Sequence, residues 1–371
     1  RSSTIALVWC SLGTLEQPIS PPIILARNLH SHPSSVHFSP TAMPVSTPEA
    51  SLSVRLVLGD ARNLEFIDDE SVHLVVTSPP YWSLKRYNEH PDQMGHIEGY
   101  EEFLAELNKV WTNVFRVLVP GGRLVCVVGD VCVSRKRYGR HVVFPLHADI
   151  CVACRRIGFD NLNPVIWHKI SNAAYEVENG NAGFLGKPYE PNAIIKNDIE
   201  FILMQRKPGG YRKPSERQRS ESRMTKQEYQ DWFQQFWRLT GASTREHPAP
   251  FPYELAYRLV RMFSFTGDTV LDPFCGTGTT LLAAANTGRH SIGIELDRAY
   301  ARMAAIRLRS EAGGLFQNVE MRFECADPVD SAIVHEDPFS DAAFSGAARK
   351  AVRYKNGAVR QPKSKLRGKG K

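Results

Sequence analysis

Four consecutive residues, Ser78, Pro79, Pro80 and Tyr81, combine hydrogen-bond acceptors with an aromatic ring directly after an apolar run at residues 72–76. Such a run predicts a buried parallel strand, so the motif would stand at the carboxyl edge of a sheet, where open α/β folds bind ligands. The two prolines restrict the backbone and make the loop a rigid frame. The Ser78 hydroxyl and the Pro79 carbonyl can accept hydrogen bonds from an amino group, and Tyr81 can stack on a planar ring.

This arrangement suits chemistry on the exocyclic amine of a nucleobase. Such an amine is a poor nucleophile because its lone pair is delocalised into the ring, and two acceptors that draw on its protons make the nitrogen more tetrahedral. In-line attack on an activated methyl group then requires mainly positioning and electrostatics. A base inside a duplex must first be flipped out, and an aromatic platform offsets part of the unstacking cost. Methylation at carbon 5 of cytosine would need a cysteine, usually after a proline, and the chain contains no Pro-Cys pair.

A second motif forms a glycine-containing turn between a predicted strand at 269–271 and a helix that begins near residue 281. Its two glycines let the backbone approach a ligand at a helix N-terminus. An acid follows the next predicted strand, 290–294, where a carboxylate can accept hydrogen bonds from both hydroxyls of a ribose. The candidate cofactor-binding residues of these two segments are Asp272, Pro273, Phe274, Gly276, Gly278, Thr279, Glu295 and Leu296.

The composition of this turn favours S-adenosylmethionine over a nicotinamide cofactor. A dinucleotide site usually has a third glycine, where this chain has Leu281. The turn also opens with Asp272, and an acid repels a pyrophosphate but attracts an ammonium or a sulfonium group. Each motif alone is compatible with a turn that serves packing only. Together they favour a donor site and an acceptor site at one sheet edge.

The elements around these motifs alternate between strand and helix. Apolar runs predict strands at 54–58, 124–128 and 164–168, and helical spacing predicts helices at 100–118, 146–157 and 252–263. This alternation is typical of an α/β protein with a doubly wound, mostly parallel sheet. No apolar run is long enough to span a bilayer. Seven cysteines, most of them inside apolar runs, suggest reduced core thiols, so we expect a protein that works inside the cell, in the bacterial cytoplasm and nucleoid or in a nucleus.

Charge divides the chain unevenly. The net charge is +7, yet the last ten basic residues all follow Asp341, the final acid, so we expect 331–371 to be a disordered basic tail that is attracted to phosphate or merely solvated. Residues 1–50 are rich in Ser and Pro and predict a disordered extension. Within 171–246, basic residues crowd between 206 and 226 and suggest a grip on a polyanion, although ordinary surface charge is the alternative: Arg206, Lys207, Arg212, Lys213, Arg217, Arg219, Arg223 and Lys226. Cys151 and Cys154 have the spacing of half a zinc site, but no second pair completes it, so we expect no bound metal.

The order of the motifs resembles the beta class of DNA amino-methyltransferases from bacterial restriction–modification systems, whose fold is circularly permuted. The resemblance extends from about residue 54 to residue 312 and implies a Rossmann-like, seven-stranded sheet of the class I methyltransferase type. It divides the chain into a catalytic half at 51–170, a target-recognition insertion at 171–246 and a cofactor-binding half at 247–330. It also implies double-stranded DNA as the partner, with S-adenosylmethionine as the methyl donor.

Particular residues acquire roles from the same resemblance. It implies that His247, Pro248 and Phe251 line the methionine end of the cofactor, and that Asp60 contacts the adenine, with Asp327 as a competitor for that role. The segment 166–169 resembles the one that lies near the flipped base. A serine before Pro-Pro-Tyr is commoner in cytosine-N4 enzymes, so Ser78 favours that base over adenine N6.

Three alternatives remain open at this point. The chain could be an adenine-N6 DNA methyltransferase, a catalytically silent DNA-binding protein of the same fold, or a nicotinamide oxidoreductase, which Asp272 and Leu281 disfavour. The sequence does not define the target site, a restriction partner or the oligomeric state, for which a homodimer is one option.

Overall fold

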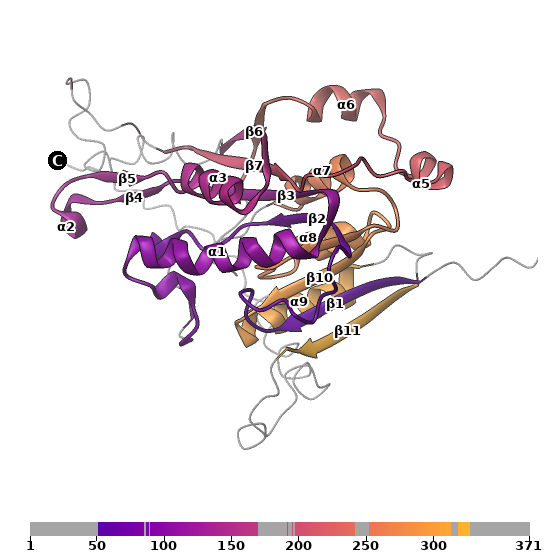
Figure 1. The fold of residues 1–371 in the computed structure, drawn as a ribbon, viewed down its shortest axis with the longest axis horizontal. Helices are drawn as coiled ribbons and strands as arrows, with labels where there is room; N and C mark the ends of the chain where they lie inside the picture. The colour runs from indigo at the N-terminus through magenta and orange to yellow at the C-terminus, as the bar shows by residue number, and fades with distance from the viewer. Residues whose placement is uncertain are drawn as a thin grey trace, which may run out of the picture. The chain divides into compact units, whose positions relative to one another are not determined.

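A nine-stranded mixed sheet forms the centre of the protein in the computed structural model (Figure 1). The structure describes residues 51–84, 87–88, 90–169, 191, 195, 197–241, 252–312 and 318–326. The strand order is β11-β1-β10-β9-β2-β3-β7-β6-β8. The strands of the sheet are β1 (Leu52–Leu58), β2 (Val72–Thr77), β3 (Leu118–Val128), β6 (Asp160–Lys169), β7 (Ile199–Arg206), β8 (Phe236–Leu239), β9 (Thr269–Asp272), β10 (His290–Glu295) and β11 (Val319–Cys325).

Helices cover both faces of this sheet. One face packs on α1 (Tyr100–Val117) and α3 (Leu146–Ile157), and the other on α7 (Tyr253–Phe263), α8 (Thr279–Ala285) and α9 (Arg298–Glu311) (Figure 1). Strand β2 shows why both layers are needed, because Val75 joins the core on the α1 side while Leu74 and Val76 join the core on the α7 side. A strand buried on both faces is a continuous apolar run, as the sequence predicted.

The sheet is parallel from β11 to β3, and β7 runs antiparallel to β3 and to β6. The expected mostly parallel α/β sheet with helices on both faces is confirmed. The expected count of seven strands is wrong, because β8 and β11 add one strand at each edge of the sheet. Strand β11 pairs with β1 in parallel and forms one edge of the sheet.

The range 171–246 contributes two strands to the sheet. Its residues 199–206 form β7, an interior strand between β3 and β6, and residues 236–239 form the edge strand β8. Two short helices, α5 (Glu216–Glu221) and α6 (Lys226–Trp232), connect these strands, and each begins with a capping box. Outside the main sheet, β4 (Val131–Val133) and β5 (Val142–Phe144) form a hairpin whose tip is α2 (Arg135–Tyr138).

No helix among the described residues is both long enough and apolar enough to cross a membrane. The N-terminal extension and the basic tail, at 1–50 and 331–371, lie outside the described residues.

Candidate active site at the carboxyl edge of the sheet

The two sequence motifs leave neighbouring strands at the same edge of the sheet. Strands β2 and β9 are parallel partners, with Val75 opposite Leu271, so the residues after each strand emerge side by side. The Thr77 hydroxyl donates a 2.6 Å hydrogen bond to Oδ1 of Asp272 and joins the two segments across 195 positions of the chain. The structure therefore brings together the Ser-Pro-Pro-Tyr segment, predicted to hold the methyl acceptor, and the glycine turn, predicted to hold the donor.

A pocket opens between these segments, and we call it the rim pocket. It encloses about 800 Å³, including the open space at its mouth. Nine of the sequence-predicted site residues line it: Asp60, Ser78, Pro80, Pro273, Phe274, Gly276, Thr279, Glu295 and Leu296. Its wall therefore combines the Ser-Pro-Pro-Tyr segment with the glycine turn and the ends of β1 and β10.

The glycine turn owes its shape to two left-handed residues. Gly276 has φ of 51° and Gly278 has φ of 76°, a region that favours glycine over other residues. Gly276 lines the rim pocket and donates its N–H to Oε2 of Glu295 at 2.8 Å. Gly278 lies outside the lining and starts helix α8, where an added Cβ would stand 3.3 Å from the Cβ of Ala304 on α9. One glycine thus faces the pocket and the other allows two helices to approach.

Glu295 is the principal carboxylate of the pocket. Its two oxygens accept hydrogen bonds from the N–H groups of Gly276 and Asp297, at 2.8 and 2.9 Å. Each oxygen therefore keeps acceptor capacity for a ligand. Burial raises the pKa of Glu295 to about 7, although the two backbone N–H groups oppose the shift. A ligand that donates hydrogen bonds here would favour the charged carboxylate.

Asp272 lies behind the pocket wall instead of in it. Its side chain is 1% exposed, and its Oδ1 accepts hydrogen bonds from the Thr77 hydroxyl and, at 3.1 Å, from the N–H of Phe274. Burial raises its pKa to about 6. The sequence suggested direct contact with a cation, whereas in this structure the carboxylate links the acceptor strand to the glycine turn.

The acceptor side is ordered around Tyr81. Its hydroxyl donates to the carbonyl of Val127 and accepts from the Ser78 hydroxyl, both at 3.4 Å, and its side chain is buried. Burial, followed by the nearby Glu200 carboxylate, raises the pKa of Tyr81 well above its usual value. Ser78 and Pro80 line the rim pocket, while Pro79 and Tyr81 do not. The ring therefore stands beside the pocket, close to the end of β3.

A partly buried ion pair lies next to this ring. Glu200 on β7 pairs with Lys169 at the end of β6, and both strands reach the carboxyl edge here. Glu200 and Tyr81 pack against the same glycine, because a Cβ added to Gly129 would stand 3.3 Å from Cγ of Glu200 and 3.4 Å from Cε2 of Tyr81. The segment 166–169 therefore ends beside the acceptor motif.

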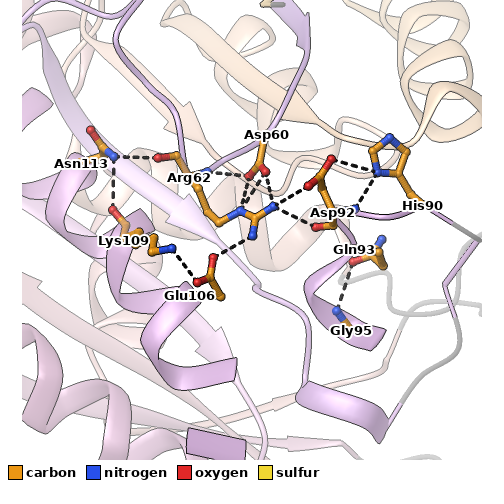
Figure 2. Close-up of polar contacts among 9 residues, drawn as sticks. All are labelled: Asp60, Arg62, His90, Asp92, Gln93, Gly95, Glu106, Lys109 and Asn113. Atoms are coloured by element: carbon orange, nitrogen blue, oxygen red, sulfur yellow. Dashed lines mark hydrogen bonds and ion pairs between the residues drawn. The ribbon is translucent and has the colours of Figure 1, made fainter. Parts of the chain in front are cut away.

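Asp60 is held by an arginine that sequence reasoning missed. Both Asp60 carboxylate oxygens accept hydrogen bonds from the Arg62 guanidinium, which also binds Glu106 at 2.7 Å and Asp92 at 3.3 Å (Figure 2). The hydrogen bond to Asp60 is the main reason why the pKa of Arg62 is raised. Asp60 and Asp92 both line the rim pocket, so a single cation fixes two parts of its wall.

Five further lining residues had no sequence signal: Tyr87, Asp92, Gln93, Met94 and Tyr300. Four of them belong to the irregular segment after the acceptor motif, which carries no periodicity. In this segment the backbone approaches Tyr87 closely, because a Cβ added to Gly95 would stand 2.7 Å from the Tyr87 ring. His247, Pro248, Phe251 and Asp327 lie outside the described residues.

The basic stretch within 171–246 lies at the opposite edge of the sheet. Arg206 pairs with Asp160, Lys207 with Glu70 and Arg212 with Asp268, and these acids lie at or just before the starts of β6, β2 and β9. Strand β6 runs in the same direction as β2 and β9, because β7 is antiparallel to both β3 and β6. All three ion pairs therefore lie at the amino ends of these strands, across the sheet from the rim pocket.

These cations therefore stabilise the fold instead of facing the rim pocket. That these residues grip a polyanion stays a prediction, and for these three it concerns a surface away from the rim pocket. Among the described residues, no cluster of three or more potential metal ligands is present.

Residues 72–306 match the protein family described as DNA methylase, of the N6/N4 type. The type II methyltransferase M.MjaI of Methanocaldococcus jannaschii is 40% identical over 275 residues, which cover 66% of this chain and 87% of that protein. The type II methyltransferase M.MthZI of Methanothermobacter thermautotrophicus is 35% identical over 292 residues, which cover 72% of this chain and 79% of the relative.

Solved structures show the same similarity. The crystal structure of TTHA0409 from Thermus thermophilus, a proposed DNA modification methylase complexed with S-adenosyl-L-methionine, is 55% identical and superposes with a TM-score of 0.60. The match covers 72% of this chain and 98% of that chain. The cytosine-N4-specific PvuII DNA methyltransferase, 22% identical with a TM-score of 0.51 over 69% of this chain and 86% of its own, shares the fold. By these matches, the chain belongs to the N6/N4 family of DNA methylases.

Proposed function

We propose that the protein transfers a methyl group from S-adenosylmethionine to the exocyclic N4 of cytosine in DNA. One observation supports this most directly: Ser78 and Pro80 line the same pocket as the glycine turn and Glu295. A methyl donor held by the turn would then be adjacent to an amine held by the serine. The crystal structure of TTHA0409 with S-adenosyl-L-methionine supports the choice of donor.

The residues of the rim pocket fit this donor. Glu295 keeps acceptor capacity for two ribose hydroxyls, and Phe274, Met94 and Ile294 supply apolar wall for an adenine ring. Asp60, fixed by Arg62, is our candidate for the adenine amino group. S-adenosylmethionine supplies a methyl group activated by its bond to a positively charged sulfur. The nearby carboxylates of Asp272 and Glu295 favour a cation over an anion in this pocket.

The acceptor segment has the groups that an exocyclic amine needs. The Ser78 hydroxyl and the Pro79 carbonyl would accept the amine protons and orient its lone pair toward the donor. Tyr81 is already fixed by hydrogen bonds to Ser78 and Val127, so the loop is ordered before substrate binds. We expect the Tyr81 ring to support the flipped base from the side away from the donor.

The choice of base depends on Ser78, which favours cytosine N4, and adenine N6 is the alternative. The likeness to the PvuII enzyme carries no weight here, because at 22% identity it concerns the fold alone. Duplex DNA incubated with the protein and labelled S-adenosylmethionine, then digested to nucleosides for mass spectrometry, separates the two. We expect N4-methylcytosine. N6-methyladenine would overturn the base assignment, and no labelled base would overturn the activity.

Tyr81→Ala provides a matched test of the acceptor site. We expect it to lower the single-turnover rate at least about 100-fold while changing the dissociation constant of S-adenosylmethionine little, since Tyr81 does not line the rim pocket. Tyr81→Phe keeps the ring and removes only the hydroxyl, and it should retain most of the rate. If Tyr81→Ala instead weakened cofactor binding with an unchanged rate, the ring would belong to the donor site.

We also propose that the chain is a circular permutation of the methyltransferase fold. The acceptor strand β2 precedes the glycine-turn strand β9 in sequence by almost 200 residues, although the two are direct neighbours in the sheet. Strands β7 and β8 belong to the central sheet, so the candidates for target recognition are the other segments of 171–246. A chimera that exchanges those segments with a relative of different sequence specificity should take on the relative's target site.

A further inference from the structure

A basic hairpin projects from the same sheet edge as the rim pocket. Strand β3 is the parallel partner of β2, with Cys126 opposite Thr77, and the chain continues from the end of β3 into the β4–α2–β5 hairpin, residues 131–144 (Figure 1). The hairpin has four basic residues near its tip, Arg135, Lys136, Arg137 and Arg140, and contains no acid. A left-handed Gly139, with φ of 73°, turns the chain back. We call residues 131–144 the basic hairpin.

The tip of the basic hairpin presents its charge to solvent. All residues from 134 to 140 are exposed, and none of the ion pairs between described residues involves Arg135, Lys136 or Arg140. The Arg140 guanidinium lies 5.3 Å from the ring centroid of Tyr138, which is itself 44% exposed. By contrast, the basic residues at the opposite edge, Arg206 and Lys207, are bound to acids. Within the part of the chain that the structure describes, Arg135, Lys136 and Arg140 therefore have no acidic partner that neutralises them.

The base of the hairpin is fixed to the acceptor motif. Phe144 on β5 packs edge-on against Trp82, at 5.0 Å between ring centroids, and the Arg137 guanidinium lies 5.7 Å from the Trp82 ring. Trp82 directly follows Tyr81, is buried, and donates from Nε1 to the carbonyl of Ile97 at 2.8 Å. A ligand held by the hairpin tip would therefore have a fixed position relative to the Ser-Pro-Pro-Tyr segment.

We propose that the basic hairpin binds the phosphate backbone of DNA next to the target base. This inference depends on the proposed function for the identity of the polyanion. DNA carries one negative charge per about 1.7 Å of its axis, so several cations on a projecting tip meet several phosphates. Phosphate contacts set the register of the protein on the duplex without reading sequence. The hairpin thereby fixes where the duplex lies while the acceptor motif holds the extruded base.

The test compares two double variants that each remove two arginine charges. Arg135→Ala with Arg140→Ala changes the hairpin, and Arg155→Ala with Arg156→Ala is the control, because these exposed residues end α3 at the other edge of the sheet. DNA binding is measured by fluorescence anisotropy from about 50 to about 200 mM salt, and the slope of log affinity against log salt is determined. Melting temperature and affinity for S-adenosylmethionine report on folding.

For the hairpin variant we expect a slope lower by about 1 to 2 and affinity reduced about tenfold or more, since each lost phosphate contact removes about 0.9 from the slope. The control variant should keep the slope of the unmodified protein. An unchanged slope in the hairpin variant, or equal losses in both variants, would overturn the inference. The proposed function fails separately, if the unmodified protein binds DNA but transfers no methyl group to it.

Discussion

Replacing Glu295 by glutamine should make both the free energy of unfolding and the cofactor affinity less dependent on pH. Burial raises the pKa of Glu295 from an ordinary 4.5 to about 7. Because the folded protein holds this proton more tightly than the unfolded chain, the resulting stability is complete below pH 4.5 and is lost as the pH rises through 7. Glutamine cannot titrate, so the variant lacks this loss.

The size of the effect follows from the shift. At 1.36 kcal/mol per pKa unit, the unmodified protein should lose about 2–3 kcal/mol of unfolding free energy between pH 5 and pH 8 relative to Glu295→Gln. Urea unfolding of both proteins at each pH measures this difference. An amide that faces the N–H groups of Gly276 and Asp297 also costs stability, but that cost does not change with pH and cancels in the comparison.

Cofactor affinity should change in the opposite direction with pH. Donors on a ribose bind the charged carboxylate, so the affinity of the unmodified protein for S-adenosylmethionine should rise about tenfold from pH 6 to pH 8. The control is Glu295→Gln, titrated with S-adenosylmethionine in a calorimeter at the same pH values. Any pH dependence of its affinity comes from ionisation of the ligand itself. The reasoning is refuted if the difference in unfolding free energy between the two proteins stays constant within about 0.5 kcal/mol over this range.

Two further substitutions test the supports of the rim pocket. Arg62→Gln leaves the partly buried Asp60 carboxylate without its guanidinium partner, so we expect about 1–3 kcal/mol less stability and weaker cofactor binding. The single-turnover rate at saturating cofactor should not change, and a slower rate with intact affinity would contradict this reasoning. Gly293→Ala places a Cβ 2.7 Å from both δ-carbons of Leu281, so chemical unfolding should show a loss of about 1–3 kcal/mol. In the double variant with Leu281→Ala, the steric part of that loss should disappear. If Gly293→Ala alone were as stable as the unmodified protein, α8 would be free to shift and the reasoning would be wrong.

Sequence reasoning succeeded where one element determines its own pattern. Apolar residues at helical spacing predicted the helix at 100–117. Short apolar runs that end in turn residues predicted the strands β9 and β10. The pairing of β2 with β9 could also be inferred, because parallel strands that end in polar motifs place those motifs at one edge.

The sequence did not predict contacts between residues that are far apart along the chain. The strand Ile199–Arg206 has an apolar core, yet it lies within a polar region, and only its partners β3 and β6 identify it as interior. The charge of Arg206 and Lys207 suggested a nucleic-acid grip, because their acidic partners are distant in sequence. Asp272 likewise has its main partner, Thr77, at the end of another strand. Composition reveals charge but not how that charge is neutralised.

The position of β1 has a consequence for synthesis of the chain. This strand is near the start of the described residues, but its partners in the sheet are β10 and β11, more than 230 residues later. During translation this apolar strand would remain without its hydrogen-bond partners until β10, more than 230 residues later, has left the ribosome. Ligand binding by a growing chain is thereby postponed, because the pocket acquires its last wall only when β10 joins β1.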